Sequence, residues 1–146
     1  MSRPPAPVHG FTLIELVVAL AIAAVLATLA YPSYSEHLHQ ARRSDAWDAL
    51  ARLQLAQERH RSRHTAFADS VQDLALPVTS PAAHYRVRVA SADAMGYALE
   101  AQAAEDSPQA RDRSCRRLRL VITRGVQQRQ AFDAAGQDSS RRCFVA

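Results

Sequence analysis

An almost unbroken apolar run from Phe11 to Ala30, 20 residues long, constrains this chain more than any other feature. A helix of about 20 predominantly apolar residues can span the hydrocarbon core of a bilayer. Glu15 lies inside the run, and a carboxylate in hydrocarbon costs on the order of 2.5–3.5 kcal/mol on insertion scales. The run therefore predicts a transmembrane helix in which the charge at Glu15 requires an explanation.

Two ordinary explanations cover only part of this pattern. A secretory signal peptide has an apolar core of about 7–15 residues followed by a small-residue cleavage site. The core in this chain is longer and contains Glu15. A plain membrane anchor explains the length of the run but leaves the glutamate unexplained.

The rest of the chain, about 110 residues, suits one small domain. All 18 basic residues are arginine, and nine of them lie between residue 111 and the C-terminus against three aspartates. The two cysteines, Cys115 and Cys143, follow the apolar run, which favours one disulfide in an oxidising compartment. The disulfide would close a loop of about 29 residues and contribute roughly 3–4 kcal/mol in the chain-entropy model. Two free structural thiols are the alternative.

A specific motif surrounds the start of the apolar run. The segment Gly10-Phe11-Thr12-Leu13-Ile14-Glu15 resembles the processing motif of type IV prepilins. The resemblance continues through Pro32 and the segment YPSYSEHLHQARRSDA, residues 31–46, which is similar to minor pilins of the PilE type. The pair Cys115 and Cys143 also fits this family. The leader departs from the family in one respect. Family leaders usually carry a basic residue directly before the glycine, whereas this chain has His9 there and its only leader arginine is Arg3.

The resemblance implies how the chain is processed and where it resides. A prepilin peptidase would cut between Gly10 and Phe11, so that residues 1–10 are a leader, and the new amino group of Phe11 would be methylated. Residues 11–31 would hold the protein in the inner membrane and later pack in the filament core. Residues 32–146 would form a head that lies in the periplasm first and in an extracellular pilus after assembly. The implied partners are other pilin subunits, the prepilin peptidase, the inner membrane and the pilus assembly platform.

The resemblance also implies a role for Glu15. In the family this glutamate is thought to meet the N-terminal amine of a neighbouring subunit, here that of Phe11, and a desolvated carboxylate costs much less when a cation pairs with it. Glu15 is therefore expected to guide assembly, with snorkelling to the lipid headgroups as the alternative. Pro32 predicts a kink or local melting of the helix, because proline removes a backbone hydrogen bond. A plain helix end at Tyr31 is the alternative.

Beyond residue 32 the periodicity predicts an α+β fold. Helical spacing of Ala46, Leu50, Leu53 and Gln57 continues the helix to about residue 63, with an apolar stripe facing the domain. After a loop, apolar and polar residues alternate with period two, which predicts half-buried antiparallel strands. The expected sheet has about four strands between about residues 84 and 132, with an ambiguous fourth strand near 126–132, and a disulfide-closed C-terminal region follows it.

The chain carries no sequence motif for catalysis. It has no C-x-x-C, H-E-x-x-H, P-loop or G-x-G-x-x-G motif, so an enzyme is not expected. His60 and His64 have a spacing that can bind metal, but no third ligand is evident in the sequence. We expect neither a metal nor a cofactor.

Arginines alternate with apolar residues in two of the expected strands. Arg86, Arg88, Arg117 and Arg119 should therefore point outward, and a simple meander would place Glu100 between them. The first interpretation is a solvated, partly neutralised face. The second adds Arg116, Arg124, Arg141 and Arg142 to form a patch for an anionic partner such as DNA. No interleaved aromatic residue is expected on this face, so base stacking is not predicted.

These observations favour a type IV pilin-like subunit, a minor pilin with a structural role in pilus assembly. One alternative is a pseudopilin of a type II secretion system, although pseudopilins commonly lack the disulfide. The other is a DNA-binding minor pilin for DNA uptake, which the arginine-rich C-terminal part favours. DNA binding that depends on salt would favour the second alternative over a purely structural subunit.

Overall fold

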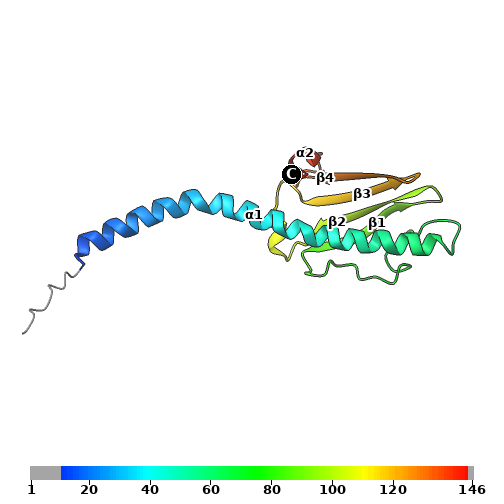
Figure 1. Ribbon diagram of the computed structural model, residues 1–146, viewed down its shortest axis with the longest axis horizontal. Coiled ribbons are helices and arrows are strands. Elements are labelled where there is room, and N and C mark those ends of the chain that lie inside the picture. Colours follow the sequence, from blue (N-terminus) through cyan, green and yellow to red (C-terminus); the bar gives the residue numbers. More distant parts are fainter. Residues whose placement is uncertain (1–10, 145–146) are drawn as a thin grey trace, which may run out of the picture. The chain divides into compact units, whose positions relative to one another are not determined.

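The computed structural model describes residues 11–144, and at residues 29, 30, 32 and 33 it describes the backbone alone. The chain divides into two compact units, one up to His37 and the other, the head, from Leu38 onward. The order of elements confirms the predicted α+β fold (Figure 1). They are α1 (Leu13–Arg61), β1 (Tyr85–Ala92), β2 (Gly96–Ala103), the 3-10 helix η1 (Pro108–Arg111), β3 (Arg117–Thr123), β4 (Val126–Phe132) and α2 (Ser140–Cys143).

Helix α1 continues through Pro32, so it neither ends at Tyr31 nor unwinds there. The kink expected at Pro32 stays a prediction. The helix ends at Arg61, and a turn follows at residues 62–63, close to the predicted end. Its last turn holds Arg59 and Arg61, whose cationic groups interact favourably with the carbonyl end of the helix dipole.

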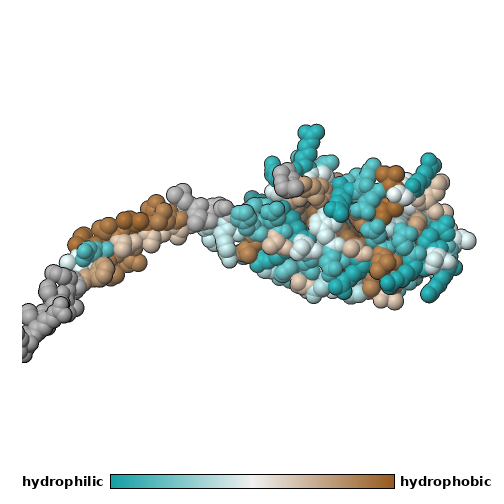
Figure 2. All heavy atoms as spheres, in the orientation of Figure 1, coloured by the Kyte–Doolittle hydropathy of each residue, from teal (hydrophilic) through white to brown (hydrophobic). Residues whose placement is uncertain are grey.

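Within residues 11–144, no helix is both long enough and apolar enough to cross a membrane. Figure 2 nevertheless shows apolar side chains along the first part of α1, and Leu13, Leu20 and Leu26 are all more than half exposed.

The four strands form one antiparallel sheet in the order β1–β2–β3–β4. This simple meander places Glu100 of β2 opposite Arg88 of β1 and opposite Arg119 of β3. The strand near 126–132 exists as β4, and its register pairs Phe132 with Arg117. Residues that are direct partners across strands share one face of a sheet, so the register decides which side chains lie together.

The core lies between the head part of α1 and one face of the sheet, which we call the inner face. Ala46, Leu50 and Leu53 of α1 are buried against the apolar residues of the strands. The inner face contributes Tyr85, Val87, Leu99, Ala101, Leu118, Leu120 and Ile122. Leu55 lies off the apolar stripe and is 52% exposed. The opposite surface of the sheet is called the outer face.

A buried polar network fixes the segment around η1 to α1. Arg43 Nε donates to Asp112 Oδ2 at 2.7 Å, and both side chains are at most 8% exposed. The Gln109 amide donates to the same carboxylate at 2.9 Å and to the His39 carbonyl at 3.2 Å. The backbone N–H of Cys115 donates to Asp112 Oδ1 at 2.9 Å. A desolvated carboxylate is tolerated here because a cation and several donors surround it.

The disulfide between Cys115 and Cys143 is present, with an S–S distance of 2.06 Å. It confirms the predicted pairing and rules out two free thiols. The bridge fastens the segment that contains α2 to the start of β3. In this segment Phe144 packs on Trp47 of α1, with the ring centroids 5.6 Å apart, and the Arg129 guanidinium lies over the same indole at 5.1 Å.

We predict that Asp112→Ala destabilises the protein by about 3–5 kcal/mol, because it removes the carboxylate that pairs with the buried Arg43 guanidinium. The matched control is Asp48→Ala, which removes an exposed i,i+4 pair with Arg52 and should cost about 0.3–0.5 kcal/mol. Urea unfolding of the full chain in detergent, followed by circular dichroism, measures both. Equal stability of the two variants would show that the buried pair does not hold the head together.

Candidate functional site

The outer face of the sheet collects the arginines that alternate along β1 and β3. The strand register arranges them in two rows that cross all four strands. The first row is Arg86, Gln102, Arg117 and Phe132, and the second row is Arg88, Glu100, Arg119 and Gln130. The prediction that the four arginines share one face is confirmed by this register.

In the second row a buried carboxylate neutralises its neighbours. The Glu100 side chain is 1% exposed, and it forms ion pairs with Arg88 on one side and Arg119 on the other. Arg119 Nε also donates to Glu100 Oε1 at 2.7 Å, whereas the contact of Arg88 with Oε2 lacks hydrogen-bond geometry. The predicted carboxylate between two arginines is therefore confirmed, and the second row has a net charge of only +1.

The first row has no carboxylate. Arg86 is exposed and has no ion pair among the described residues. The Arg117 guanidinium lies over the Phe132 ring at 4.5 Å, and its buried Nε has no hydrogen-bond partner within residues 11–144. This row therefore presents two cations that no acidic side chain of the described chain compensates.

Phe132 corrects one expectation. We expected no interleaved aromatic residue on this face, but Phe132 lies there, and the Arg119 guanidinium is also within 5.6 Å of its ring centroid. The inner side of β4 was ambiguous from sequence, because alternate positions that share one face are both apolar and polar: Val126, Gln128, Gln130 and Phe132. The structure places the polar residues of this set outside together with the phenylalanine, because Phe132 pairs with Arg117.

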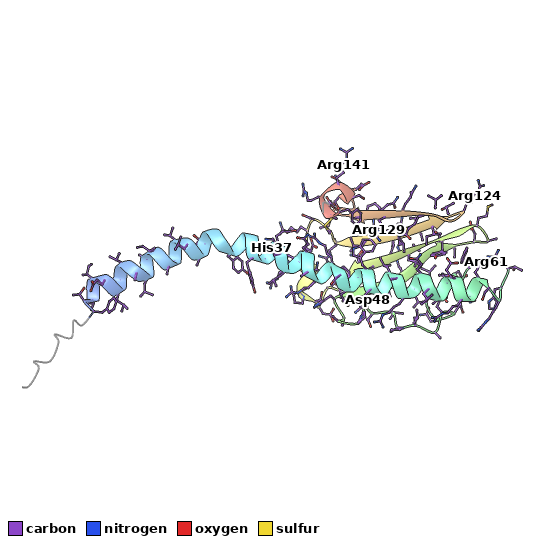
Figure 3. The ribbon with its side chains drawn as sticks, viewed as in Figure 1. His37, Asp48, Arg61, Arg124, Arg129 and Arg141 are labelled. Atoms are coloured by element: carbon purple, nitrogen blue, oxygen red, sulfur yellow. A yellow bond between two sulfur atoms is a disulfide. The ribbon has the colours of Figure 1, made fainter. Side chains whose placement is uncertain are left out.

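The other arginines of the predicted patch lie apart from these rows. Arg116 directly precedes β3 and donates to the Ala110 carbonyl, which directs it toward the η1 segment. Arg124 lies in the turn between β3 and β4, and Arg141 lies in α2. Figure 3 shows Arg124 and Arg141 at opposite ends of the sheet. Arg142 also lies in α2, so the patch consists of the two rows and separate cations at both ends.

At the other unit, Thr12 and Glu15 form a capping box. The Thr12 N–H donates to Glu15 Oε2 at 2.9 Å, the Thr12 hydroxyl donates to the same oxygen at 2.7 Å, and the Glu15 N–H meets the Thr12 hydroxyl at 3.4 Å. Such reciprocal bonds satisfy backbone donors that a helix start leaves unpaired. Glu15 therefore has partners within its own chain, a role that the T-x-x-E spacing could have revealed.

The remaining predicted residues are placed as follows. Phe11 is 88% exposed at the start of the described chain, and Gly10 lies outside the described residues. His60 and His64 stack on each other with ring centroids 3.8 Å apart. Within residues 11–144 no group of three potential metal ligands is found.

Comparison with known proteins agrees with this architecture. Residues 32–119, more than half of the chain, match the family described as "Type IV minor pilin ComP, DNA uptake sequence receptor". Residues 6–31 match the "Prokaryotic N-terminal methylation motif". A "Fimbrial protein" of Moraxella nonliquefaciens is 37% identical over 60 residues, which cover 41% of this chain and 39% of that protein. Both the N-terminal motif and the head thus match type IV pilins, a family of structural subunits, and the chain belongs to the type IV minor pilins described as ComP.

Proposed function

We propose that this minor pilin enters a type IV pilus and binds DNA there through the outer face of its sheet. The observation that carries the proposal is the first row, where Arg86 and Arg117 flank Gln102 with no compensating carboxylate among the described residues. Membership of a family described as a DNA uptake sequence receptor supports the same partner.

The chemistry of the outer face suits the phosphate backbone of DNA. Cations that neutralise phosphates release condensed counterions, which favours binding at low salt without regard to sequence. Arg88 and Arg119 contribute less, because Glu100 already neutralises part of their charge. The Phe132 ring is covered by two guanidinium groups, so we assign it the role of holding Arg117 in place rather than stacking on bases.

Processing and location form the second part of the proposal. The match to the methylation motif supports cleavage between Gly10 and Phe11 by a prepilin peptidase, followed by methylation of Phe11. Residues 11–31 would then hold the subunit in the inner membrane before the assembly platform moves it, with the head in the periplasm, into an extracellular pilus. The exposed apolar side chains of this part of α1 would become buried against other pilin subunits.

Assembly would use the capping box. Thr12 holds the Glu15 carboxylate at the N-terminal end of α1, close to where cleavage would create the cationic amine of Phe11. A neighbouring subunit's amine could then approach a carboxylate whose position is already set. Thr12 is thus a positioning residue for Glu15.

We predict that Arg86→Ala combined with Arg117→Ala weakens DNA binding on the order of tenfold at about 50 mM salt, because two phosphate contacts are lost. Fluorescence anisotropy with a labelled duplex and the full chain in detergent measures the affinity. The matched control is Arg52→Ala, an exposed arginine on α1 already paired with Asp48, which should bind as the wild type does. Equal affinity of the double variant and the control would contradict the assignment to the outer face.

We predict that Glu15→Ala is cleaved normally but is depleted from pili, because no carboxylate remains to pair with the incoming amine. Thr12→Val should show a milder depletion, and Thr12→Ser, which keeps the hydroxyl, should enter pili normally. Immunoblots of sheared pili against the cell-bound fraction provide the measurement. Normal entry of the Thr12→Val variant would show that the capping box does not position Glu15.

We predict that the mature chain begins with N-methyl-Phe11 and that replacing Gly10 by a bulky residue leaves the leader attached, because a side chain would hinder a peptidase fitted to glycine. Intact-mass analysis of the protein from cells with and without the prepilin peptidase distinguishes the two forms. A mature protein that starts at Met1 in peptidase-containing cells would overturn this part of the proposal.

A further inference from the structure

The tip of the β3–β4 hairpin, residues 123–128, is an exposed set of side chains that the proposal above does not use. Strand β4 is an edge strand, and its first four residues are exposed on both faces. Arg124, Gln127 and Gln128 have no side-chain hydrogen bond or ion pair within residues 11–144. Val126 and Met95, which lies in the neighbouring β1–β2 turn, are 62% and 58% exposed.

The turn holds an arginine in a backbone conformation that arginine disfavours. Arg124 has φ +50° and Gly125 has φ +79°, as in the two-residue type I′ turn, where Asn-Gly is the favoured pair. The Arg124 N–H donates to the Met95 carbonyl at 2.9 Å, so the two hairpin tips are held together. A bulky residue in the left-handed region at an exposed position, without a partner for its charge, points to a function for the side chain.

These side chains match the groups that base pairs present in the major groove. An arginine can bond guanine O6 and N7, a glutamine can bond adenine N6 and N7, and an apolar side chain can contact the thymine methyl. The tip supplies all three kinds of contact. Arg124 is the arginine, Gln127 or Gln128 is the glutamine, and Val126 with Met95 provides the apolar surface. The neighbouring carboxylate of Asp93 is engaged in its own turn, where Oδ1 accepts from the N–H groups of Met95 and Gly96.

The dimensions also agree with a duplex that lies along the outer face. The major groove is about 12 Å wide and admits a two-stranded β-ribbon. The six residue steps from Arg117 to Thr123 in β3 span about 20 Å at about 3.3 Å per residue. This corresponds to about six base pairs at about 3.4 Å each. Phosphate contacts at the first row and groove contacts at the tip can therefore be made by one duplex.

We propose that the β3–β4 tip reads base edges in the major groove, with Arg124 as a residue that determines specificity. The inference rests on the proposed DNA binding and assigns affinity and sequence specificity to different residues. Arg86 and Arg117 position the duplex through its phosphates, and the tip distinguishes sequences, since phosphate contacts carry no sequence information.

The test uses the full chain in detergent and a pool of random-sequence duplexes, from which bound DNA is selected and sequenced. The wild type should enrich a motif that contains a guanine. Arg124→Asn should lower the preference at that guanine about 5- to 150-fold, while affinity for the unselected pool falls by much less. Because asparagine suits the type I′ turn better than arginine, the unfolding temperature of this variant should not be lower than that of the wild type.

Arg124→Lys serves as the second variant, because it keeps the charge but cannot bond guanine through two nitrogens in a fixed fork. It should keep part of the preference, because an ammonium can still donate to guanine O6 and N7, and the salt dependence should stay unchanged because the charge is kept. An unchanged motif with Arg124→Asn would overturn the assignment to the tip. A wild type that binds the pool without enriching a motif overturns this inference alone, whereas a wild type that binds no DNA overturns the proposed function as well.

Discussion

Packing of the apolar stripe of α1 against the inner face determines where every arginine of β1 and β3 points. Side chains alternate between the two faces of a strand, so a register slip of one residue would turn the apolar set outward and the arginines into the core. Burial of Leu50, Leu53, Leu99 and Leu118 makes such a slip costly. The basic outer face is therefore a direct consequence of the requirement to bury the inner one.

A sheet surface with four arginines needs some internal compensation, and Glu100 supplies it. Its carboxylate sits in the central part of the sheet and pairs with arginines on both neighbouring strands. Without this carboxylate, the arginines of β1 and β3 would repel one another across β2. Because the compensation is confined to the second row, the first row keeps its charge for an external anion. Glu100 thus makes the arginines of the second row a structural pair. The arginines of the first row, Arg86 and Arg117, have no such carboxylate beside them.

Much of this organisation could be predicted from the sequence, because it depends on local periodicity. The long helix, the four strands, the outward arginines and the carboxylate between them follow from spacing alone. The disulfide could be expected from two cysteines after an apolar run. The pairing of Arg43 with Asp112 could not, since the two residues are 69 positions apart and no local pattern links them. The direction of Arg116 and the place of Phe132 likewise depend on tertiary contacts. The capping box of Thr12 with Glu15, by contrast, depends only on the local T-x-x-E spacing.

The salt dependence of DNA affinity tests most directly whether the uncompensated arginines bind phosphates. The full chain in detergent would be titrated with one labelled duplex at several salt concentrations between about 50 and 200 mM. If the first row and further unpaired arginines each neutralise a phosphate, log K should fall linearly with log salt with a slope of about −2 or steeper. An affinity that does not change with salt, or no binding at the lowest concentration, would contradict the assignment of the outer face to DNA.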